Sequence, residues 1–366
     1  MLQVARHQEQ ITVTACGQQE IPPGAYSPAE MTEIRARAIT TLLAEQRFAG
    51  RDVVIALPWD QLHIRSVRIP PMPEEEVGQA VRFEAAERLG VEPEQAEIRH
   101  LLAGDVRQGT EVRQEVIVLG VERAVIQDYV RLLQGVGLRP AAIDAAPCAL
   151  FRSFERFLRR GEDRNEANVF IDLGYSGTQV AVSRGSELIF VKSIPIGGRR
   201  FDELVAESLS LSPNEAVELR RQLRSRHVAS AIGLAADDHT GVPVDENIRR
   251  SVLDTLRPAL EQLSKEIALC VRYCAVTFRG PRADAVTVVG GEAADADILQ
   301  VLSDQVNIPF HTGKPMRHVT FETEVRGADR RNGQPEWATA LGLALKPRGP
   351  TSRPATRPTA VEEVPA

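Results

Sequence analysis

The sequence lacks a marked excess of charge of either sign, and this argues against one large class of function. Lysine and arginine together number 44 against 50 aspartates and glutamates, which gives a net charge of −6. A protein that binds nucleic acid generally presents a strongly basic face. We therefore expect no nucleic-acid partner.

Cysteines and long apolar runs are also scarce. The four cysteines are too scattered to indicate a disulfide scaffold or a zinc ribbon, and the pair Cys270 and Cys274 is more typical of buried side chains on one helix face than of ligands. No run approaches the roughly 18 apolar residues that a membrane-spanning helix needs. The N-terminus has no charged segment followed by an apolar one. These absences predict a reduced, soluble protein of the cytoplasm.

The residues that are present suffice for two ordinary domains. The chain has 366 residues, of which 43% are hydrophobic, enough for two domains with real cores. The charged stretch GEDRNEAN, residues 161–168, is a plausible boundary between two halves. From Lys346 onward the chain is rich in proline and poor in large apolar side chains, so residues 346–366 are predicted to be a disordered tail.

In the first half, local signals predict a helix followed by a buried strand. Ser27, Pro28 and Glu30 form a capping arrangement for a helix that runs to about Gln46. The apolar run DVVIALP, residues 52–58, is typical of a buried strand in a central sheet.

A compact βαββαβ unit then interrupts this first sheet. It begins with the strand LHIRSVRIP at residues 62–70 and ends with the strand LRPAAID at residues 138–144. Between them we expect two helices, Glu74 to Leu89 and Arg123 to Gln134, and two strands joined by an exposed hairpin loop.

The second half opens with a strand-turn-strand pattern and continues mostly in helices. After the hairpin NVFIDLGYSGTQVAV, residues 168–182, a helix is expected from about Phe201, and the capping box that begins at Ser212 predicts another. Apolar residues at alternating spacings of four and three predict one long helix, kinked near its start by a proline at position 258, and they are Leu256, Leu260, Leu263, Ile267, Cys270 and Cys274. Residues 284–306 predict a strand, a glycine turn and a helix, and residues 336–346 a last helix.

The turn after the first strand of this half carries the first candidate site. Asp172 ends an apolar strand, where a carboxylate can orient a magnesium ion. Gly174, Ser176, Gly177 and Thr178 follow, and their amides and hydroxyls suit phosphate oxygens. The alternative is an ordinary hairpin turn, because glycine and aspartate are common turn residues.

Two glycine pairs farther along repeat this ambiguity. Gly197 and Gly198 precede the helix near Phe201, where they serve either a ligand or the turn into the helix. Gly290 and Gly291 lie between a buried strand and a helix, where the absence of side chains admits a flat ligand such as an adenine ring. Each pair alone is more often a turn than a site.

Together, these motifs resemble the second half of the actin/hexokinase-like ATPase fold. The closer resemblance is to the PilM family of type IV pilus assembly, which is related to the cell-division protein FtsA. It covers nearly everything from Ile21 to Leu345, and the inserted βαββαβ unit is similar to the family's extra subdomain 1C. The segments that carry the resemblance are residues 57–91, 140–154, 169–182, 193–222, 286–310 and 337–345.

The resemblance implies an α/β fold of two duplicated, ribonuclease H-like domains. It implies subdomain 1A at residues 1–67 and 143–166, 1C at 68–142, 2A at 167–203 and 271–345, and 2B at 204–270. It also implies ATP and Mg²⁺ as cofactors, with Asp172 on the metal and with Glu292 beside the glycines at the nucleotide. PilM-like proteins act chiefly as ATP-bound scaffolds with little turnover.

A membrane-protein partner also follows from the resemblance. PilM-like proteins bind the N-terminal segment of the inner-membrane protein PilN, so the chain is expected at the inner-membrane face and on the membrane only through that partner. Pilus motor ATPases and further copies of the chain are additional candidate partners. The groove for the segment would lie between the first sheet's subdomain and the inserted unit.

One helix of the inserted unit offers this groove an apolar side. The side consists of Val77, Val81, Ala85 and Leu89 and follows the very acidic start of the helix at residues 74–76. The alternative is that these residues pack on the unit's own small sheet.

The chain departs from the family pattern in two places. Nothing before Ile21 resembles the Asp-x-Gly hairpin with which the first half of this fold opens and grips the nucleotide, and the first aspartate is Asp52. Either the start at Met1 omits about a dozen residues, which is the reading we favour because a sheet without its first strand leaves an unpaired edge, or the motif is truly absent. The second departure is Glu292, where the family usually has a small residue.

Three other functions remain as alternatives, and the first is a nucleotide-free pseudo-ATPase adaptor, which follows if the first phosphate motif is truly absent. An ATPase or kinase of the same superfamily would need a carboxylate base in the interdomain cleft, and Asp144 is the best-placed candidate, although it is equally suited to cap the following helix. A type II secretion L-type protein shares the fold but continues into a membrane span, whereas this sequence continues into a polar tail.

Overall fold

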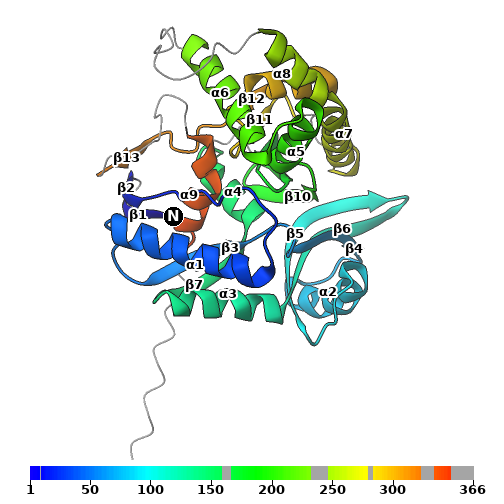
Figure 1. Ribbon diagram of the computed structural model, residues 1–366. Coiled ribbons are helices and arrows are strands. Elements are labelled where there is room, and N and C mark those ends of the chain that lie inside the picture. The colour runs from blue at the N-terminus through cyan, green and yellow to red at the C-terminus, as the bar shows by residue number, and fades with distance from the viewer. Residues whose placement is uncertain (9, 159–165, 232–245, 279–282, 323–333, 348–366) are drawn as a thin grey trace, which may run out of the picture.

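The computed structural model describes residues 1–8, 10–158, 166–231, 246–278, 283–322 and 334–347, with the backbone alone at 83–87 and 225–231 (Figure 1). The predicted disordered tail therefore lies almost entirely outside the described residues. None of the described helices is both long enough and apolar enough to span a membrane.

The second half is built on a five-stranded sheet of order β10-β9-β8-β11-β12. Its first three strands pair antiparallel, while β11 and β12 run parallel to β8. The strands are β8 (Ala167–Leu173), β9 (Thr178–Arg184), β10 (Glu187–Ile194), β11 (Val286–Val289) and β12 (Phe310–Thr312). Because β8 and β11 run parallel, their carboxyl ends lie at the same edge of the sheet. The end of β8 at Leu173 is therefore next to the turn that follows β11.

The first half repeats this plan with a gap in the middle. Strands β1 (Leu2–His7) and β2 (Gln10–Cys16) pair antiparallel, as β9 and β10 do, and β13 (Val319–Phe321) extends their sheet. Strands β3 (Asp52–Leu57) and β7 (Arg139–Ala145) pair parallel, as β11 and β12 do, but they form a separate sheet. Among the described residues, no strand joins the two sheets in the way that β8 joins its neighbours.

The inserted unit forms a separate antiparallel sheet of order β4-β6-β5 with a helix beside it. Its elements are β4 (His63–Ile69), α2 (Glu74–Leu89), β5 (Ala96–Gln108) and β6 (Glu111–Glu122). The predicted boundary at residues 67 and 68 cuts through β4, which pairs with β6 and belongs to the insertion. The last predicted strand of the unit is β7, which instead pairs with β3 of the first half. Both boundaries of the inserted unit depend on which strands pair, and these pairs join residues that are distant in sequence.

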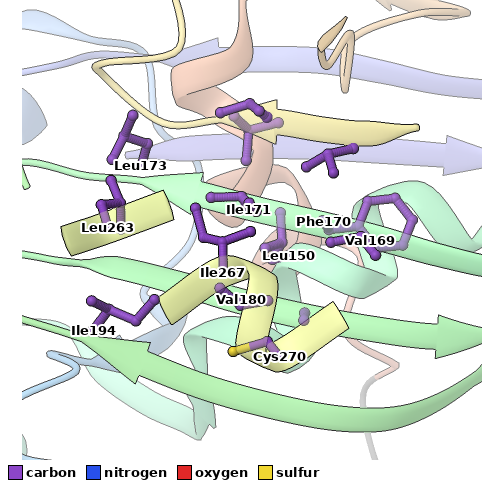
Figure 2. Close-up of a cluster of buried hydrophobic side chains, with 14 of the residues drawn as sticks. Leu150, Val169, Phe170, Ile171, Leu173, Val180, Ile194, Leu263, Ile267 and Cys270 are labelled. Atoms are coloured by element: carbon purple, nitrogen blue, oxygen red, sulfur yellow. The ribbon is translucent and has the colours of Figure 1, made fainter. Parts of the chain in front are cut away.

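One helix connects the sheets of both halves. Helix α4 (Ala146–Glu155) packs on β3 and β7 of the first half and on β8, β9 and β10 of the second. Phe154 stacks on Phe170 of β8 with 5.1 Å between ring centroids, and Leu150 is fully buried. Figure 2 shows Leu150, Ile171 and Val180 in the same cluster as Leu263 and Ile267 of the long helix.

The remaining helices follow the sequence signals closely. Both capping boxes are confirmed, because Ser27 and Glu30 bond reciprocally, as do Ser212 and Glu215. The predicted apolar stripe is buried along one long helix, which continues through the proline at position 258. The helices are α1 (Pro28–Glu45), α3 (Arg123–Gly135), α5 (Gly198–Leu209), α6 (Pro213–Ala231), α7 (Glu246–Phe278), α8 (Ala296–Val306), the 3₁₀ turn η3 (Pro335–Trp337) and α9 (Ala338–Ala344).

Helix α9 crosses α4 at very short range, and a glycine makes this possible. A Cβ atom at Gly342 would overlap the carbonyl group of Ala149, and the Gly342 carbonyl accepts a hydrogen bond from Arg152 Nη1 at 2.8 Å. The obstacle is backbone, which cannot swing aside as a flexible side chain can. The crossing therefore requires glycine at this position.

We expect Gly342→Ala to lower the free energy of unfolding by about 1–3 kcal/mol, because the added methyl group forces the two helices apart. Chemical denaturation of the full chain measures this change. Gly135→Ala is the matched control, since Gly135 is exposed and its Cβ would meet nothing within 4 Å, so it should leave stability unchanged or slightly raised. Equal stability of the two variants would contradict the packing described.

Candidate functional site

The turn between β8 and β9 is held closed by its own hydrogen bonds. The Gly174 amide donates to the Gly177 carbonyl at 3.1 Å. The buried Thr178 hydroxyl donates to the carbonyl of Ile196 at 2.6 Å. The Thr178 side chain is therefore directed at the protein rather than at the space above the turn.

This turn lies directly on the N-terminus of α5. The Gly198 amide donates to the Gly174 carbonyl at 3.0 Å, and the Arg199 amide donates to the Tyr175 carbonyl at 2.7 Å. A Cβ at Gly197 would come within 2.5 Å of the Gly174 oxygen. Amides at a helix N-terminus lack intrahelical partners, and here two of them are satisfied by the turn. The helix begins at Gly198, three residues before the predicted start near Phe201.

The turn after β11 closes the same site from another side. Gly290 has a φ of 95°, and a Cβ there would come within 2.5 Å of both the Asp172 carboxylate and the Leu173 carbonyl. The Glu292 amide donates to that carbonyl at 3.1 Å. The three glycine motifs therefore meet at the carboxyl end of β8. The predicted nucleotide-site residues that the structure brings together are Asp172, Gly174, Ser176, Gly177, Thr178, Gly197, Gly198, Gly290, Gly291 and Glu292.

A buried ion cluster, which we call the Arg220 cluster, joins α5 and α6 to this turn. Arg220 is 2% exposed, and its Nη1 donates to Asp202 Oδ1 at 2.6 Å while its Nη2 pairs with the Glu292 carboxylate. Arg224, one helical turn farther along, donates to Glu292 Oε1 and to the Gly291 carbonyl, both at 3.1 Å. Glu292 thus has an arginine on each of its two oxygens.

A tryptophan from the first half covers the turn. Trp59, in the segment between β3 and β4, donates from Nε1 to Ser176 Oγ at 3.1 Å. Its ring lies so close to Gly177 that a Cβ there would come within 2.7 Å of it. The first half therefore contributes an indole at the place where the two halves meet.

Sequence reasoning missed Asp202 of the Arg220 cluster and four further residues of this site. The four further residues are Trp59, Arg220, Arg224 and Thr339, none of which lies in a glycine motif. The spacing of Arg220 and Arg224 places both on one helix face. Together with the unexpected acid at Glu292, that spacing was the one available signal for the cluster.

Comparison with known proteins identifies the family. A family model described as type IV pilus assembly protein PilM matches residues 1–225. The chain belongs to the PilM family. A solved structure described as a PilM-PilN type IV pilus biogenesis complex matches with 24% identity and a TM-score of 0.72, over 94% of this chain and 94% of that one. Ethanolamine utilization protein EutJ from Carboxydothermus hydrogenoformans matches more weakly, with 18% identity and a TM-score of 0.40 over 62% of this chain and 61% of that one. No curated protein matches.

The actin-like ATPase fold expected of a PilM protein is confirmed by this likeness. Proteins of that fold generally bind ATP and Mg²⁺. In the arrangement described, the Gly198 and Arg199 amides already have partners and the Glu292 carboxylate holds the arginines. These residues therefore do not fit a nucleotide phosphate unless the Glu292 carboxylate moves.

Asp172 does not fit a Mg²⁺ ligand either. Its Oδ2 accepts a hydrogen bond from the Thr339 hydroxyl at 2.9 Å, and its Oδ1 lies under Gly290. Burial raises the pKa of this carboxyl group above its usual 3.8, and the Thr339 hydroxyl only partly opposes the shift. The part of the chain that the structure describes holds no group of three or more His, Cys, Asp or Glu side chains arranged for a metal ion.

The predicted apolar side of α2 does not line a groove. Val77, Val81 and Leu89 are buried in the core between α2 and the inserted sheet, together with residues of β4 and β6. This is the alternative that the sequence left open. The side chain of Ala85 lies outside the described residues.

The candidate base of the kinase alternative is also engaged. Asp144 forms ion pairs with Arg152 and Lys346, each at 3.0 Å, and accepts a hydrogen bond from the Ala145 amide at 2.9 Å. Both of its carboxylate oxygens are therefore engaged within the protein.

An apolar groove of about 550 Å³ lies between β10 and α7. Val276 is 72% exposed and Leu269 45% exposed in this groove, which makes Val276 the most exposed large apolar side chain of the described residues. Phe190 and Tyr273 rings, 5.3 Å apart, also line it. We call it the α7 groove. Its lining residues are Phe190, Lys192, Leu269, Cys270, Arg272, Tyr273, Val276 and Thr277.

We expect Asp172→Asn to stabilise the protein at pH 7, because burial disfavours the ionised carboxylate. Because the folded-state pKa of Asp172 is raised, the folded state holds the proton more tightly, and stability is lost as pH rises from 3.8 through the folded pKa. Asparagine stays neutral and accepts the Thr339 hydrogen bond.

Unfolding free energies measured at several pH values test this expectation. The difference between Asp172→Asn and the wild type should disappear at about pH 3, below the usual aspartate pKa. Exposed Asp105→Asn serves as the control and should not alter the pH profile in this way. Destabilisation by Asp172→Asn at pH 7 would show instead that the ionised carboxylate is favoured there.

Proposed function

We propose that this chain is a scaffold of type IV pilus assembly that docks a segment of a PilN-like inner-membrane protein. Membership of the PilM family supports the pilus role. The observation that carries the partner is the likeness, over 94% of both chains, to a protein solved as a PilM-PilN complex. In this proposal the chain acts at the inner-membrane face and reaches the membrane through that partner.

We place the docking site in the α7 groove rather than on α2. The apolar side of α2 is buried in the core of the inserted unit, whereas Val276 and Leu269 are exposed on α7. Contiguous exposed apolar side chains rimmed by polar ones are typical of interaction sites. The cationic side chains of Lys192 and Arg272 provide that rim.

The α7 groove also adjoins the inserted unit that distinguishes this family from actin. The Tyr273 hydroxyl, at one side of the groove, donates to Glu115 Oε1 of β6 at 2.5 Å. Arg68 of β4 pairs with the same carboxylate at 2.7 Å. A segment held in the groove would therefore contact α7 next to the Tyr273–Glu115 hydrogen bond that attaches α7 to the inserted sheet. Binding of the segment would then change the strength of this attachment.

An active ATPase or kinase is the second candidate, and fewer observations support it. Phosphoryl transfer needs positioned phosphates, a metal ion and an activated nucleophile. The α5 amides, Asp172 and Asp144, which are the groups suited to those roles, are all engaged within the protein. Motor ATPases and further copies of the chain are additional candidate partners of such a scaffold.

We expect Val276→Glu to weaken binding of the partner's cytoplasmic N-terminal segment at least about tenfold, because it places a charge where an apolar side chain of the segment would lie. Titration calorimetry with that synthetic segment and the full chain measures the change. Since Val276 is mostly exposed, the variant should unfold at the same temperature as the wild type.

Val112→Glu is the matched control, because Val112 is 44% exposed on β6 and lies outside the α7 groove. It should bind the segment as the wild type does. Equal binding by Val276→Glu and the wild type would move the docking site elsewhere. Loss of self-association without loss of segment binding would assign the groove to a second copy of the chain.

A further inference from the structure

We infer that the Glu292 carboxylate fills an anion site built from Arg220, Arg224 and the N-terminus of α5, and that its removal turns this place into a binding site for phosphate-bearing anions. The glycine motifs around it were predicted to hold nucleotide. The position of Glu292 explains why these motifs do not fit a nucleotide in the structure described. This inference is independent of the docking role proposed above.

The two arginines define the site. Arg220 is almost completely buried and Arg224 is 20% exposed in its side chain, so the pair runs from the interior to the surface. Their positive charges are balanced by Asp202 and Glu292. Arg220 Nε has no hydrogen-bond partner. Without Glu292, both arginines lose a directly paired carboxylate, and only Asp202 and the nearby Asp295 remain to balance them. A buried charge without a close partner is strongly unfavourable.

The N-terminus of α5 supplies the second element of the site through its partial positive charge, while its Gly198 and Arg199 amides stay bonded to the turn carbonyls. Helix N-termini carry partial positive charge and favour anions. Helix α5 has no acidic residue in its first turn, and its N-cap, Gly197, offers no side chain. The Glu292 carboxylate lies against Gly198, so close that a Cβ there would overlap it. An acid from a different segment thus stands where a bound anion would stand.

An added anion would have to replace this carboxylate rather than bind beside it. The small cavity next to the cluster, lined by Arg220, Arg224 and Asp295, has a volume of only about 20 Å³, which is room for about one water molecule. Access from solvent is available at Gly291, which is exposed and whose carbonyl accepts from Arg224. Truncation of Glu292 therefore adds the space of its side chain and frees positive charge beside this existing opening.

The test measures thermal stability of the full chain against rising inorganic phosphate or pyrophosphate, with chloride at matched ionic strength. Glu292→Ala should be less stable than the wild type in chloride. Pyrophosphate should then raise its unfolding temperature in a saturable manner, by about 2 °C or more, while the wild type does not respond. ADP in place of pyrophosphate shows whether the site accepts a nucleotide as well as the free anion.

Glu115→Ala is the matched control. Glu115 is 1% exposed and paired with Arg68, so its removal also strips a carboxylate from an arginine, but far from any glycine motif. It should show no saturable response. The double variant Glu292→Ala with Arg224→Ala should lose the response that the single variant gains.

Three outcomes would overturn the inference. The first is a Glu292→Ala protein that responds to pyrophosphate no more than Glu115→Ala does. The second is a wild type that responds as strongly as the variant, which would show that the carboxylate does not fill the site. If Glu292→Ala unfolds in chloride, its refolding yield in pyrophosphate becomes the measurement, and failure to refold in either salt is the third.

Discussion

The packing of α5, α6 and the turn after β11 depends on the buried guanidinium of Arg220. Burying it is unfavourable unless oppositely charged groups surround it, and Asp202 and Glu292 meet that condition from α5 and from the turn after β11. Because α6 carries the arginine, one side chain connects the consecutive helices α5 and α6 with the distant turn after β11. The glycine motifs close on each other within this frame, and their amides bond to neighbouring carbonyls.

The two halves of the chain are joined by helix packing and by β13, which follows β12 in the chain and extends the β1-β2 sheet of the first half. Helix α4 touches strands of both halves, and α9 crosses it at Gly342. Thr339 of α9 reaches Asp172 at the end of β8, and Trp59 reaches Ser176 from the first half. Helix α9 and the Trp59 segment are thus each connected to the glycine motifs by one hydrogen bond.

Local features could be predicted from the sequence, and contacts between distant segments could not. The capping boxes at Ser27 and Ser212 and the apolar stripe of α7 depend on neighbours within a few residues, and the structure has them as expected. The glycine motifs were correctly expected to share one place. Which group accepts each amide, and that Arg220 would meet Glu292 across 72 residues, depends on tertiary packing that no local pattern encodes. For the same reason Val77 and Val81 offered an apolar side without showing what covers it.

The central claim is that the Glu292 carboxylate occupies the anion position of a nucleotide-type site. A crystal structure of the wild-type chain grown with ATP and Mg²⁺ at high concentration tests it most directly. The account predicts the Glu292 carboxylate between Arg220 and Arg224, with no phosphate against Gly198. Phosphate oxygens bonded to the Gly198 amide or to these arginines, with the Glu292 side chain turned away, would contradict it.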